Sequence, residues 1–490
     1  MRTLNVKNSF YLTTPIFYPS AKLHLGHAYT MTLADALARY RRMGKKTYFL
    51  AGSDENTQKV VDAAAKAGVE PIAFLDGIIR NFEKLYDSLE ITYDQFVRTT
   101  DRQIHWPGAQ ELWRLIDAAG DLYKKEYEGL YCVGHEAFVT EKDLVDGKCP
   151  DHGTVPERLR EENYFFRLSR YADVLREKIE NDELQIVPQS RKKEILSFIA
   201  SGLEDVSFSR SRRHGWPEGL GIPVPGDDSQ VMYVWCDALA NYVSALGFGR
   251  DDTLYREFWP ADVHIIGKDI LRFHAVIWPA MLLSAGLPLP KTLFVHGLIT
   301  SGGRKMSKTL GNVIDPEELI ETYGAEAVRY FLLRHVSPFE DGDITREGFK
   351  EAYTANLTNG LGNLVARVMK LAETHLPEPA CGELVESVEK PEPKPFPQEY
   401  GDALDAFEFN KAMDLIWARI AALDERITNE KPFSVIKEDS EKGKAIIREL
   451  VLELYKIGEL LAPFMPATSE KILAAIRENK KPENLFPRLG

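Results

Sequence analysis

The short motif His24-Leu25-Gly26-His27 and its flanking segments constrain the fold more than any other part of the sequence. A β-prone run at residues 10–13 precedes the motif, and an apolar-periodic run at 33–42, typical of a helix, follows it. A helix N-terminus presents unpaired N–H groups and a partial positive charge, which stabilise a phosphate. Two imidazoles there can hold a phosphoryl centre, and Gly26, which lacks a Cβ, leaves room for a nucleotide. The alternative is a pair of capping or core histidines.

A second motif, Lys305-Met306-Ser307-Lys308-Thr309, lies far downstream between two glycine-bearing stretches. A flexible loop with two lysines three residues apart can close over a polyphosphate and leave with it, although such a loop taken alone is usually solvated surface. HLGH and KMSKT in this order resemble the paired signatures of class I aminoacyl-tRNA synthetases. That resemblance implies an enzyme that forms an aminoacyl adenylate from ATP.

The order of strand-like and helix-like runs predicts an α/β protein. Short β-rich runs such as 47–51 alternate with helical runs such as 57–67 and 71–89, which indicates a parallel sheet with crossover helices. The alternation stops between about 120 and 225, resumes, and then gives way to helical periodicity, with a Pro- and Glu-rich loop at 376–400. We therefore expect a split nucleotide-binding domain followed by a helical bundle.

The length, charge and composition of the chain limit the classes of protein to which it can belong. The 490 residues are enough for about three domains. The net charge of −13 argues against sequence-blind nucleic-acid binding, so DNA is not an expected partner. No apolar run approaches the roughly 20 residues of a membrane helix, and the N-terminus lacks the pattern of a signal peptide. We expect a cytoplasmic protein that does not enter a membrane.

Beyond the two motifs, the sequence resembles methionyl-tRNA synthetases from about residue 10 to the C-terminus. The match lies in TTPIFYPSAKLHLGH, VWCDALANY, HIIGKDILRFHAVIWPAML and KMSKTLGN. It implies a Rossmann-type parallel-sheet catalytic domain, split by a zinc-knuckle insertion and followed by an α-helical anticodon-binding bundle. The expected division is 1–118 and 227–297 for the two halves of the catalytic domain, 119–226 for the connective insertion, 298–350 for the KMSKT loop and linker region, and 351–490 for the anticodon-binding domain.

The resemblance also implies a methionine pocket, formed by Ile16, Tyr18, Asp54, Trp235, Ala238, Leu239, Tyr242, Phe273, His274 and Trp278. Residues 235, 238, 239 and 242 fall on one helical face, and 274 and 278 are again i and i+4, although plain core packing has the same pattern. An aromatic pocket suits a polarizable thioether, and a Tyr hydroxyl or His N–H can donate weakly to its sulfur.

Asp54 follows the strand at 47–51, at the sheet edge where ligands of α/β proteins bind, and its carboxylate can pair with the substrate ammonium. Helix capping by Ser53 or Asp54 is a competing explanation. The segment reads GSDENT where relatives usually have an Asp-Glu-His-Gly run, so Asn56 and Thr57 replace the histidine and glycine.

The implied reaction is the ligation of methionine to tRNA(Met) in two steps. The methionine carboxylate attacks the α-phosphorus of ATP, with Mg²⁺ sharing the charge of the leaving pyrophosphate, and the methionyl group then passes to the 3′-terminal adenosine. The expected catalytic residues are His24, His27, Lys305 and Lys308. The expected ATP-binding residues are Gly26, Gly267, Asp269, Ile299, Ser307 and Lys308.

Two Cys-x2-His pairs in the insertion, Cys132 with His135 and Cys149 with His152, are spaced as ligands of tetrahedral structural zinc. Relatives that bind metal in this insertion usually have cysteine where this chain has His135. In the helical region, the resemblance assigns Asn363, Arg367 and Phe433 to the anticodon, with phenylalanine where relatives carry tryptophan.

Three other functions compete with this interpretation. Synthetases for leucine, isoleucine, valine or cysteine share the two motifs, but long editing insertions mark the first three, and this insertion is short. A nucleotidylyltransferase would not need the helical C-terminal third. A non-catalytic tRNA-binding paralogue would have no reason to keep both histidines and both lysines. We expect a monomer, because no basic or OB-like tail follows the bundle.

Overall fold

The computed structural model describes residues 8–19, 22–132, 137–139, 141–150, 153–212, 217, 219–306, 313–377 and 396–489. The chain divides into two compact units, each assembled from segments that are distant in the sequence. The first unit comprises Met1–Leu23, Lys45–Lys84 and Thr92–His296, and the second comprises His24–Gly44, Leu85–Ile91 and Gly297–Gly490.

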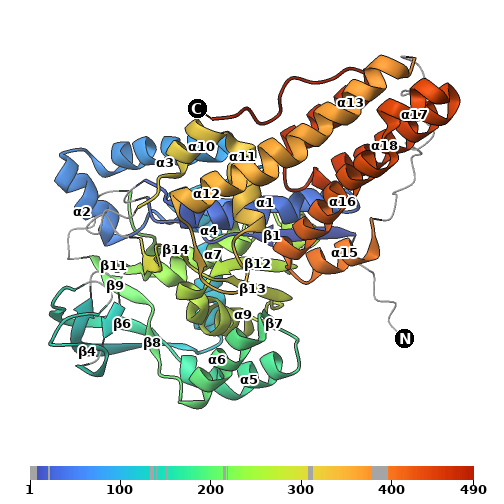
Figure 1. Cartoon of the computed structure of the whole chain (residues 1–490). Helices are drawn as coiled ribbons and strands as arrows, with labels where there is room; N and C mark the ends of the chain where they lie inside the picture. The colour runs from blue at the N-terminus through green and yellow to red at the C-terminus, as the bar shows by residue number, and fades with distance from the viewer. Residues whose placement is uncertain are drawn as a thin grey trace, which may run out of the picture. The chain divides into compact units, whose positions relative to one another are not determined.

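The centre of the first unit is a six-stranded sheet in the order β3-β2-β1-β12-β13-β7 (Figure 1). All its pairings are parallel. The strands are β1 (Ser9–Thr13), β2 (Lys46–Ser53), β3 (Gln95–Arg98), β7 (Gln185–Val187), β12 (Val263–Gly267) and β13 (Thr292–His296). Every residue of β1, β12 and β13 is buried, as expected for central strands covered on both faces. The parallel α/β core is therefore confirmed.

Most of the helices around this sheet share one hydrophobic core with it, which includes Tyr11 and Leu50 from the strands and Trp113 and Leu239 from the helices. Val60 and Leu75, on the first two helices named below, form a separate small cluster with Leu220. The sequence sets their ends locally: Thr57 caps the start of α2, and Gly68, at a φ of 68°, ends it. The helices are α2 (Gln58–Ala67), α3 (Pro71–Ser88), α4 (His105–Ala118), α5 (Ala172–Glu180), α6 (Gln189–Ala200), α7 (Val234–Ser244), α8 (Thr253–Phe258) and α9 (Trp278–Ser284).

Two small antiparallel sheets lie within residues 119–232. One has the order β5-β4-β6-β8 and the other the order β10-β11-β9. Their strands are β4 (Leu122–Cys132), β5 (Ala137–Val139), β6 (Glu157–Phe166), β8 (Val206–Ser207), β9 (Ser209–Ser211), β10 (Pro223–Val224) and β11 (Asp227–Met232). Strand β7 lies in the same stretch of sequence, yet it forms an edge of the central sheet.

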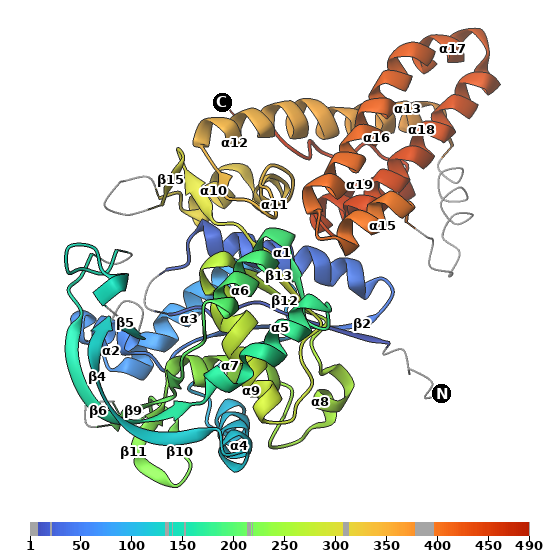
Figure 2. The ribbon, with the colours of Figure 1, turned by 90° about the horizontal axis from the view of Figure 1, so that it is seen from below.

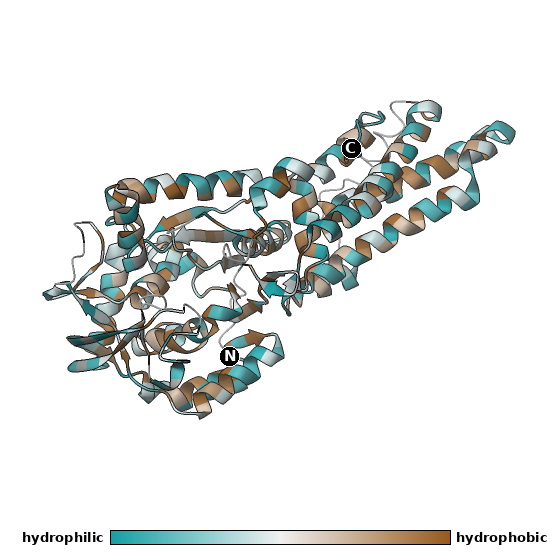
Figure 3. Cartoon of the chain, turned by 60° about the vertical axis from the view of Figure 1, so that its left-hand side comes forward, coloured by the Kyte–Doolittle hydropathy of each residue, from teal (hydrophilic) through white to brown (hydrophobic). Residues whose placement is uncertain are grey.

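The second unit is mainly helical, and α13, α16, α18 and α19 pack around one another (Figure 2). Buried residues of α18 recur at helical spacing, and brown and teal residues alternate along the helices in Figure 3. The helices are α1 (Leu25–Arg42), α10 (Pro316–Tyr323), α11 (Ala325–Arg334), α12 (Arg346–Ala352), α13 (Asn363–His375), α15 (Gln398–Asp405), α16 (Phe409–Glu430), α17 (Pro432–Glu438), α18 (Ser440–Leu461) and α19 (Pro466–Arg477).

A π-helix, Tyr353–Gly362, joins α12 to α13. The unit also contains a three-stranded sheet in the order β15-β14-β16. Its strands are β14 (Ile299–Ser301), β15 (Arg304–Lys305) and β16 (Gly342–Asp343). Most of the predicted loop at 376–400 lies outside the described residues. Among the helices that the structure describes, none combines the length and the apolar character that crossing a membrane requires.

Candidate active site

The carboxyl ends of β1 and β2 bring three predicted pocket residues together. After β1 the chain stays extended, and the Phe17 N–H donates to the Gly52 carbonyl at 3.3 Å while the Phe17 carbonyl accepts from the Asp54 N–H at 3.0 Å. Ile16 and Tyr18, which flank Phe17, therefore lie beside Asp54. Glycine is required at 52, because a Cβ there would lie 2.8 Å from Cγ2 of Ile16.

Helix α7 carries four of the residues predicted to form the methionine pocket. Trp235, Ala238, Leu239 and Tyr242 have the helical spacing that the sequence predicted, and the last three are buried. The Trp235 indole stacks on the Phe273 ring with centroids 3.6 Å apart and planes 9° apart. Residues from two distant segments thus form a single apolar surface, which suits a long unbranched side chain.

The segment that carries Phe273 and His274 departs from the predicted α-helix. Phe273 and His274 belong to a π-helix, Phe273–Ile277, and α9 begins only at Trp278. The assumption that His274 and Trp278 are related as i and i+4 of an α-helix is therefore wrong. A π-helical turn closes over five residues, and such turns are frequent at functional sites. The Tyr242 ring still contacts both side chains, at 5.8 Å between centroids in each case.

Hydrogen bonds fix which atoms of His274 carry protons. Its Nδ1 lies 3.0 Å from the Ile270 carbonyl, which can only accept, so Nδ1–H donates and Nε2 must accept. The Tyr242 hydroxyl, 2.8 Å from Nε2, donates to it. Burial lowers the pKa of His274 to about 4, which keeps the ring neutral. The Tyr242 O–H and the His274 N–H, which were expected to donate to a substrate sulfur, therefore both donate to acceptors within the protein.

The sequence analysis missed His264, which lies on β12 in the same cluster. Its Nε2 accepts from the Trp278 indole N–H at 3.2 Å, and its Nδ1 lies 2.7 Å from Oγ1 of Thr13. Its ring packs 4.3 Å from that of Tyr242. Burial, and then the neighbouring His274, lower the pKa of His264. A histidine within a strand that is otherwise continuously apolar was the signal that could have identified it, because buried polar groups need partners.

Asp54 is buried after the end of β2, and its charge acts on Tyr242. Burial, together with that charge, raises the pKa of the Tyr242 phenol. The alternative that Ser53 or Asp54 caps the next helix is wrong, because the Thr57 side chain accepts from the Val60 N–H at 3.2 Å. Thr57 has a φ of −128°, so this turn does not need the glycine of relatives. Asp54 is therefore not needed as a cap.

The HLGH motif forms a capping box at the start of α1. Nδ1 of His24 accepts from the Gly26 N–H at 3.1 Å, and Nδ1 of His27 accepts from the His24 N–H at 3.0 Å. The proton of each ring therefore lies on Nε2. Burial, and then His24, lower the pKa of His27, so that it is neutral. A Cβ at Gly26 would lie 2.9 Å from Cε1 of His24, so the glycine makes room for that ring. The capping alternative is confirmed, and the cap uses Nδ1 of each ring.

The remaining predicted ATP-binding residues are distributed over both units. Gly267 ends β12, and a Cβ there would lie 2.6 Å from Oδ1 of Asp269, so these two residues are close neighbours. Ile299 begins β14, and Lys305 ends β15. Ser307 and Lys308 lie outside the described residues.

Comparison with known proteins of similar sequence identifies the family to which this chain belongs. A model of tRNA synthetases class I (M) matches residues 10–155 and 141–369, and a model of the anticodon binding domain of methionyl tRNA ligase matches 386–487. The methionine–tRNA ligase of Caldanaerobacter subterraneus is 43% identical over 475 residues, which cover 95% of this chain and 74% of that protein. The chain belongs to the methionyl-tRNA ligase family. The methionine–tRNA ligase of Thermotoga maritima is 39% identical over 96% of this chain and 76% of that protein.

Solved structures agree with this family. Mycobacterium tuberculosis methionyl-tRNA synthetase in complex with methionyl-adenylate superposes with a TM-score of 0.85 at 36% identity, covering 98% of this chain and 99% of that chain. Its apo form superposes with a TM-score of 0.79 at 33% identity, covering 100% and 98% of the two chains. The enzyme class expected from the sequence, methionine–tRNA ligase, is therefore confirmed.

Two of the four residues predicted to bind zinc are described in this member of the methionyl-tRNA ligase family. Cys132 ends β4, and Cys149 begins a turn in which its N–H donates to the Thr154 carbonyl at 2.9 Å. Both cysteines are buried. His135 and His152 lie outside the described residues, and no group of three or more potential ligands gathers within the described part of the chain.

The predicted anticodon residues lie on the helical unit, which contains the segment matched by the family's anticodon-binding model. Asn363 begins α13 and is exposed, and Arg367 forms an ion pair with Asp424 of α16. Phe433 lies at the start of α17 with 49% of its surface exposed, which is unusual for so large an apolar residue.

The neutral state of His274 predicts a loss of stability in mild acid. The unfolded chain protonates this histidine near pH 6.5, whereas the folded chain resists protonation until about pH 4. The free energy of unfolding should therefore fall as the pH drops through this window, by roughly 3 kcal/mol for this residue. Urea denaturation at pH 7 and pH 5 should show a smaller loss in His274→Gln than in the wild-type chain. An identical loss in both would contradict the prediction.

Proposed function

We propose that this chain activates methionine with ATP and transfers the methionyl group to the 3′-terminal adenosine of tRNA(Met), for translation in the cytoplasm. The observation that supports this most directly is the pocket in the first unit. Its stacked Trp235 and Phe273 offer an apolar surface, and Asp54 supplies a buried carboxylate near Tyr242. A free amino acid with a long apolar side chain matches both features.

In this proposal Asp54 pairs with the substrate ammonium, while the aromatic residues enclose the thioether. Burying the substrate ammonium and the Asp54 carboxylate costs solvation free energy. Their attraction offsets this cost only when both groups are held in good geometry. The Tyr242 hydroxyl, whose proton is donated to His274, keeps its ring fixed beside the proposed side-chain site. The pocket therefore orients the α-carboxylate by holding the ammonium and the side chain.

The ATP site is proposed to use neutral donors rather than charged histidines. His24 and His27 would each donate Nε2–H to the α-phosphoryl oxygens, where charge develops as the carboxylate attacks. Lys305 and Lys308 would hold the β- and γ-phosphates together with Mg²⁺, with Ser307 beside them. Gly26, whose N–H donates to His24, would contribute by allowing the position of that ring. Asp269, next to Gly267, would accept from the ribose hydroxyls, and the Ile299 backbone would bind adenine.

For the second step, the helical unit is proposed to select tRNA(Met). Asn363 and Arg367 would hydrogen-bond to the exposed base edges of a CAU anticodon. The exposed Phe433 ring would stack on one of these bases. Because Arg367 is paired with Asp424, base recognition would require it to exchange one acceptor for another.

The decisive experiment is ATP–pyrophosphate exchange with each of the twenty amino acids, in the presence of Mg²⁺ and without tRNA. We expect exchange with methionine alone. Exchange with leucine, isoleucine, valine or cysteine instead would favour another synthetase. No exchange in folded protein would favour a tRNA-binding paralogue.

We also propose that Cys132, His135, Cys149 and His152 hold a structural zinc ion. Cys132 and Cys149 are both buried free thiols, which suits this metal, since thiolate and imidazole are its usual structural ligands. When bound, zinc would supply folding free energy to the insertion and no step of the reaction.

Replacing Cys149 with serine is expected to release the zinc ion, because serine is a far weaker ligand. The zinc content of the purified protein, measured by elemental analysis, should fall from about one equivalent to near zero. Cys236→Ser, which changes a buried cysteine on α7, is the control and should keep the metal. Unchanged zinc in Cys149→Ser would remove this assignment.

A further inference from the structure

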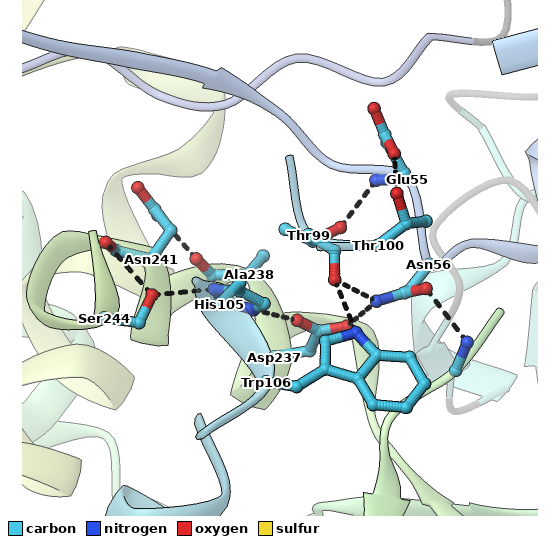
Figure 4. A network of polar contacts seen from close by, with 11 residues as sticks. Glu55, Asn56, Thr99, Thr100, His105, Trp106, Asp237, Ala238, Asn241 and Ser244 are labelled. Atoms are coloured by element: carbon cyan, nitrogen blue, oxygen red, sulfur yellow. Dashed lines mark hydrogen bonds and ion pairs between the residues drawn. The ribbon is translucent and has the colours of Figure 1, made fainter. Parts of the chain in front are cut away.

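A buried polar network links the turn after β2 to α7 (Figure 4). The Asn56 side-chain amide donates to the Thr99 carbonyl at 2.9 Å and to Oδ2 of Asp237 at 2.7 Å. Its carbonyl oxygen accepts from the Gly221 N–H at 2.9 Å. Asparagine is well suited to this position, because it has two N–H groups and one acceptor on a short side chain.

The network continues from Asp237 into α4. Oδ1 of Asp237 accepts from Nε2 of His105 at 2.6 Å, and Nδ1 of His105 lies 2.8 Å from Oγ of Ser244. Asp237 therefore accepts one hydrogen bond on each carboxylate oxygen, from two different segments of the chain. An isolated buried carboxylate would be costly, so these two donors stabilise the position of α7.

The Asp237, His105 and Ser244 side chains have the order of a hydrolytic triad, but their surroundings exclude that function. All three residues are 0% exposed. Helices α4 and α7 touch at this point, since a Cβ at Gly108 would lie 2.5 Å from Cβ of Ser244. No substrate can reach the serine, and the cluster therefore holds segments together.

The position of these residues in the sequence connects them to the methionine pocket. Asn56 follows Asp54 by two residues, and Asp237 lies on α7 between Trp235 and Tyr242. The hydrogen bond between Asn56 and Asp237 thus ties the carboxylate proposed for the ammonium to the helix that faces the side chain. The two elements are 181 residues apart in the sequence.

We propose that Asn56, His105 and Asp237 are positioning residues that set the distance between Asp54 and the α7 wall, and thereby select amino acids by side-chain length. This inference rests on the proposed methionine activation. A substrate held at both Asp54 and α7 is selected by the length of its side chain only if the distance between these two points is fixed. Small displacements of either point reduce both substrate binding and the reaction rate. The network supplies the rigidity without touching the substrate.

The test compares Asn56→Asp, Asp237→Asn and the reciprocal double exchange in ATP–pyrophosphate assays with methionine, ethionine and homocysteine. Asn56→Asp places an oxygen where an N–H donated, and Asp237→Asn places an N–H against the N–H of Asn56. Each single change is expected to raise KM for methionine about 10- to 100-fold. Each should also reduce the preference for methionine over ethionine and homocysteine by about tenfold, while KM for ATP stays within about twofold.

The double exchange should restore part of this loss, because it swaps the donor and the acceptor of one hydrogen bond. The amide introduced at position 237 would donate to the carboxylate introduced at position 56 and would accept from His105. That carboxylate would still accept from the Gly221 N–H, and the Thr99 carbonyl would keep the Trp106 indole N–H at 3.0 Å. Asn56→Ala, which introduces no repulsion, replaces Asn56→Asp if the latter does not fold. Non-additivity in this cycle measures the coupling between positions 56 and 237.

Tyr171→Phe is the stability control. It removes the hydrogen bond from the Tyr171 hydroxyl to Oδ2 of Asp121 at 2.5 Å, in the same unit but on neither α7 nor the turn at 54–57. This variant should melt at a lower temperature with unchanged amino-acid preference. If Asn56 and Asp237 variants also lose stability but keep the wild-type preference, the positioning role is overturned. Wild-type protein that activates no amino acid would instead contradict the proposed function itself.

Discussion

Replacing His24 with asparagine is expected to slow adenylate formation by about 10²- to 10³-fold, the usual cost of removing one donor to a developing oxyanion, and to leave the melting temperature unchanged. The His24 ring has two roles that asparagine separates. Nδ1 accepts from the Gly26 N–H at the start of α1, whereas the proton on Nε2 is the proposed phosphoryl donor. Asparagine is among the best N-cap residues, so it keeps the first role and loses the second.

His24→Ala is the matched variant, because it loses the cap as well. It should be as slow as His24→Asn in ATP–pyrophosphate exchange and also less stable by about 1 kcal/mol. Pre-steady-state measurement of adenylate formation, with thermal melts of both variants, separates these effects. Near-normal adenylate formation in His24→Asn would show that the histidine serves α1 alone.

Much of the fold could be predicted because its signals are local. The β-prone runs at 10–13 and 47–51 are expected as strands, and they fall within β1 and β2 of the central sheet. The helix face at 235–242 was expected from spacing, and α7 confirms it. Strand β7 was not identified, because three residues are too few to show a period. The π-helix at Phe273–Ile277 was also missed, since its apolar spacing resembles that of an α-helix.

The site was predicted less completely, because its partners are distant in the sequence. The motifs predict which residues face the pocket, but the acceptor for the Tyr242 proton and the contacts of His264 depend on the fold. Asn56 was noticed as a departure from relatives. Its three hydrogen bonds come from segments 43, 165 and 181 residues away, so its function could not be inferred from the local sequence.

The compact unit to which helix α1 belongs could not be predicted from the local sequence either. Its place after β1 predicts a crossover helix of the sheet, yet its contacts group it with the helical second unit. The reason is a buried arginine on α11. The Arg329 guanidinium pairs with Oδ2 of Asp35 at 2.7 Å, and both residues are 0% exposed. No periodicity or composition signal identifies a pair of opposite charges that are both fully buried.

Replacing Arg329 with methionine is therefore expected to destabilise the second unit by about 3–5 kcal/mol, the usual cost of removing one partner from a buried ion pair. Arg329 also donates to the Leu89 carbonyl at 2.9 Å, the Pro463 carbonyl at 3.2 Å and the Phe464 carbonyl at 2.8 Å. Methionine fills similar volume but leaves Asp35 and these carbonyls without those donors. Hydrogen exchange should show faster opening of α1, α11 and the start of α19 together.

The double variant Arg329→Met with Asp35→Asn tests whether the destabilisation comes from the buried Asp35 charge without Arg329 or from lost packing. A neutral amide at position 35 can still interact with Arg39, which now donates to Asp35 at 2.8 Å, and no longer buries a charge without its main partner. The double variant should thus be more stable than Arg329→Met alone. Together with the Asp35→Asn single variant it gives the interaction energy between positions 35 and 329, which we expect to be about 1–3 kcal/mol. Equal destabilisation in both would show that the ion pair contributes little, and that Arg329 acts through its three carbonyl contacts.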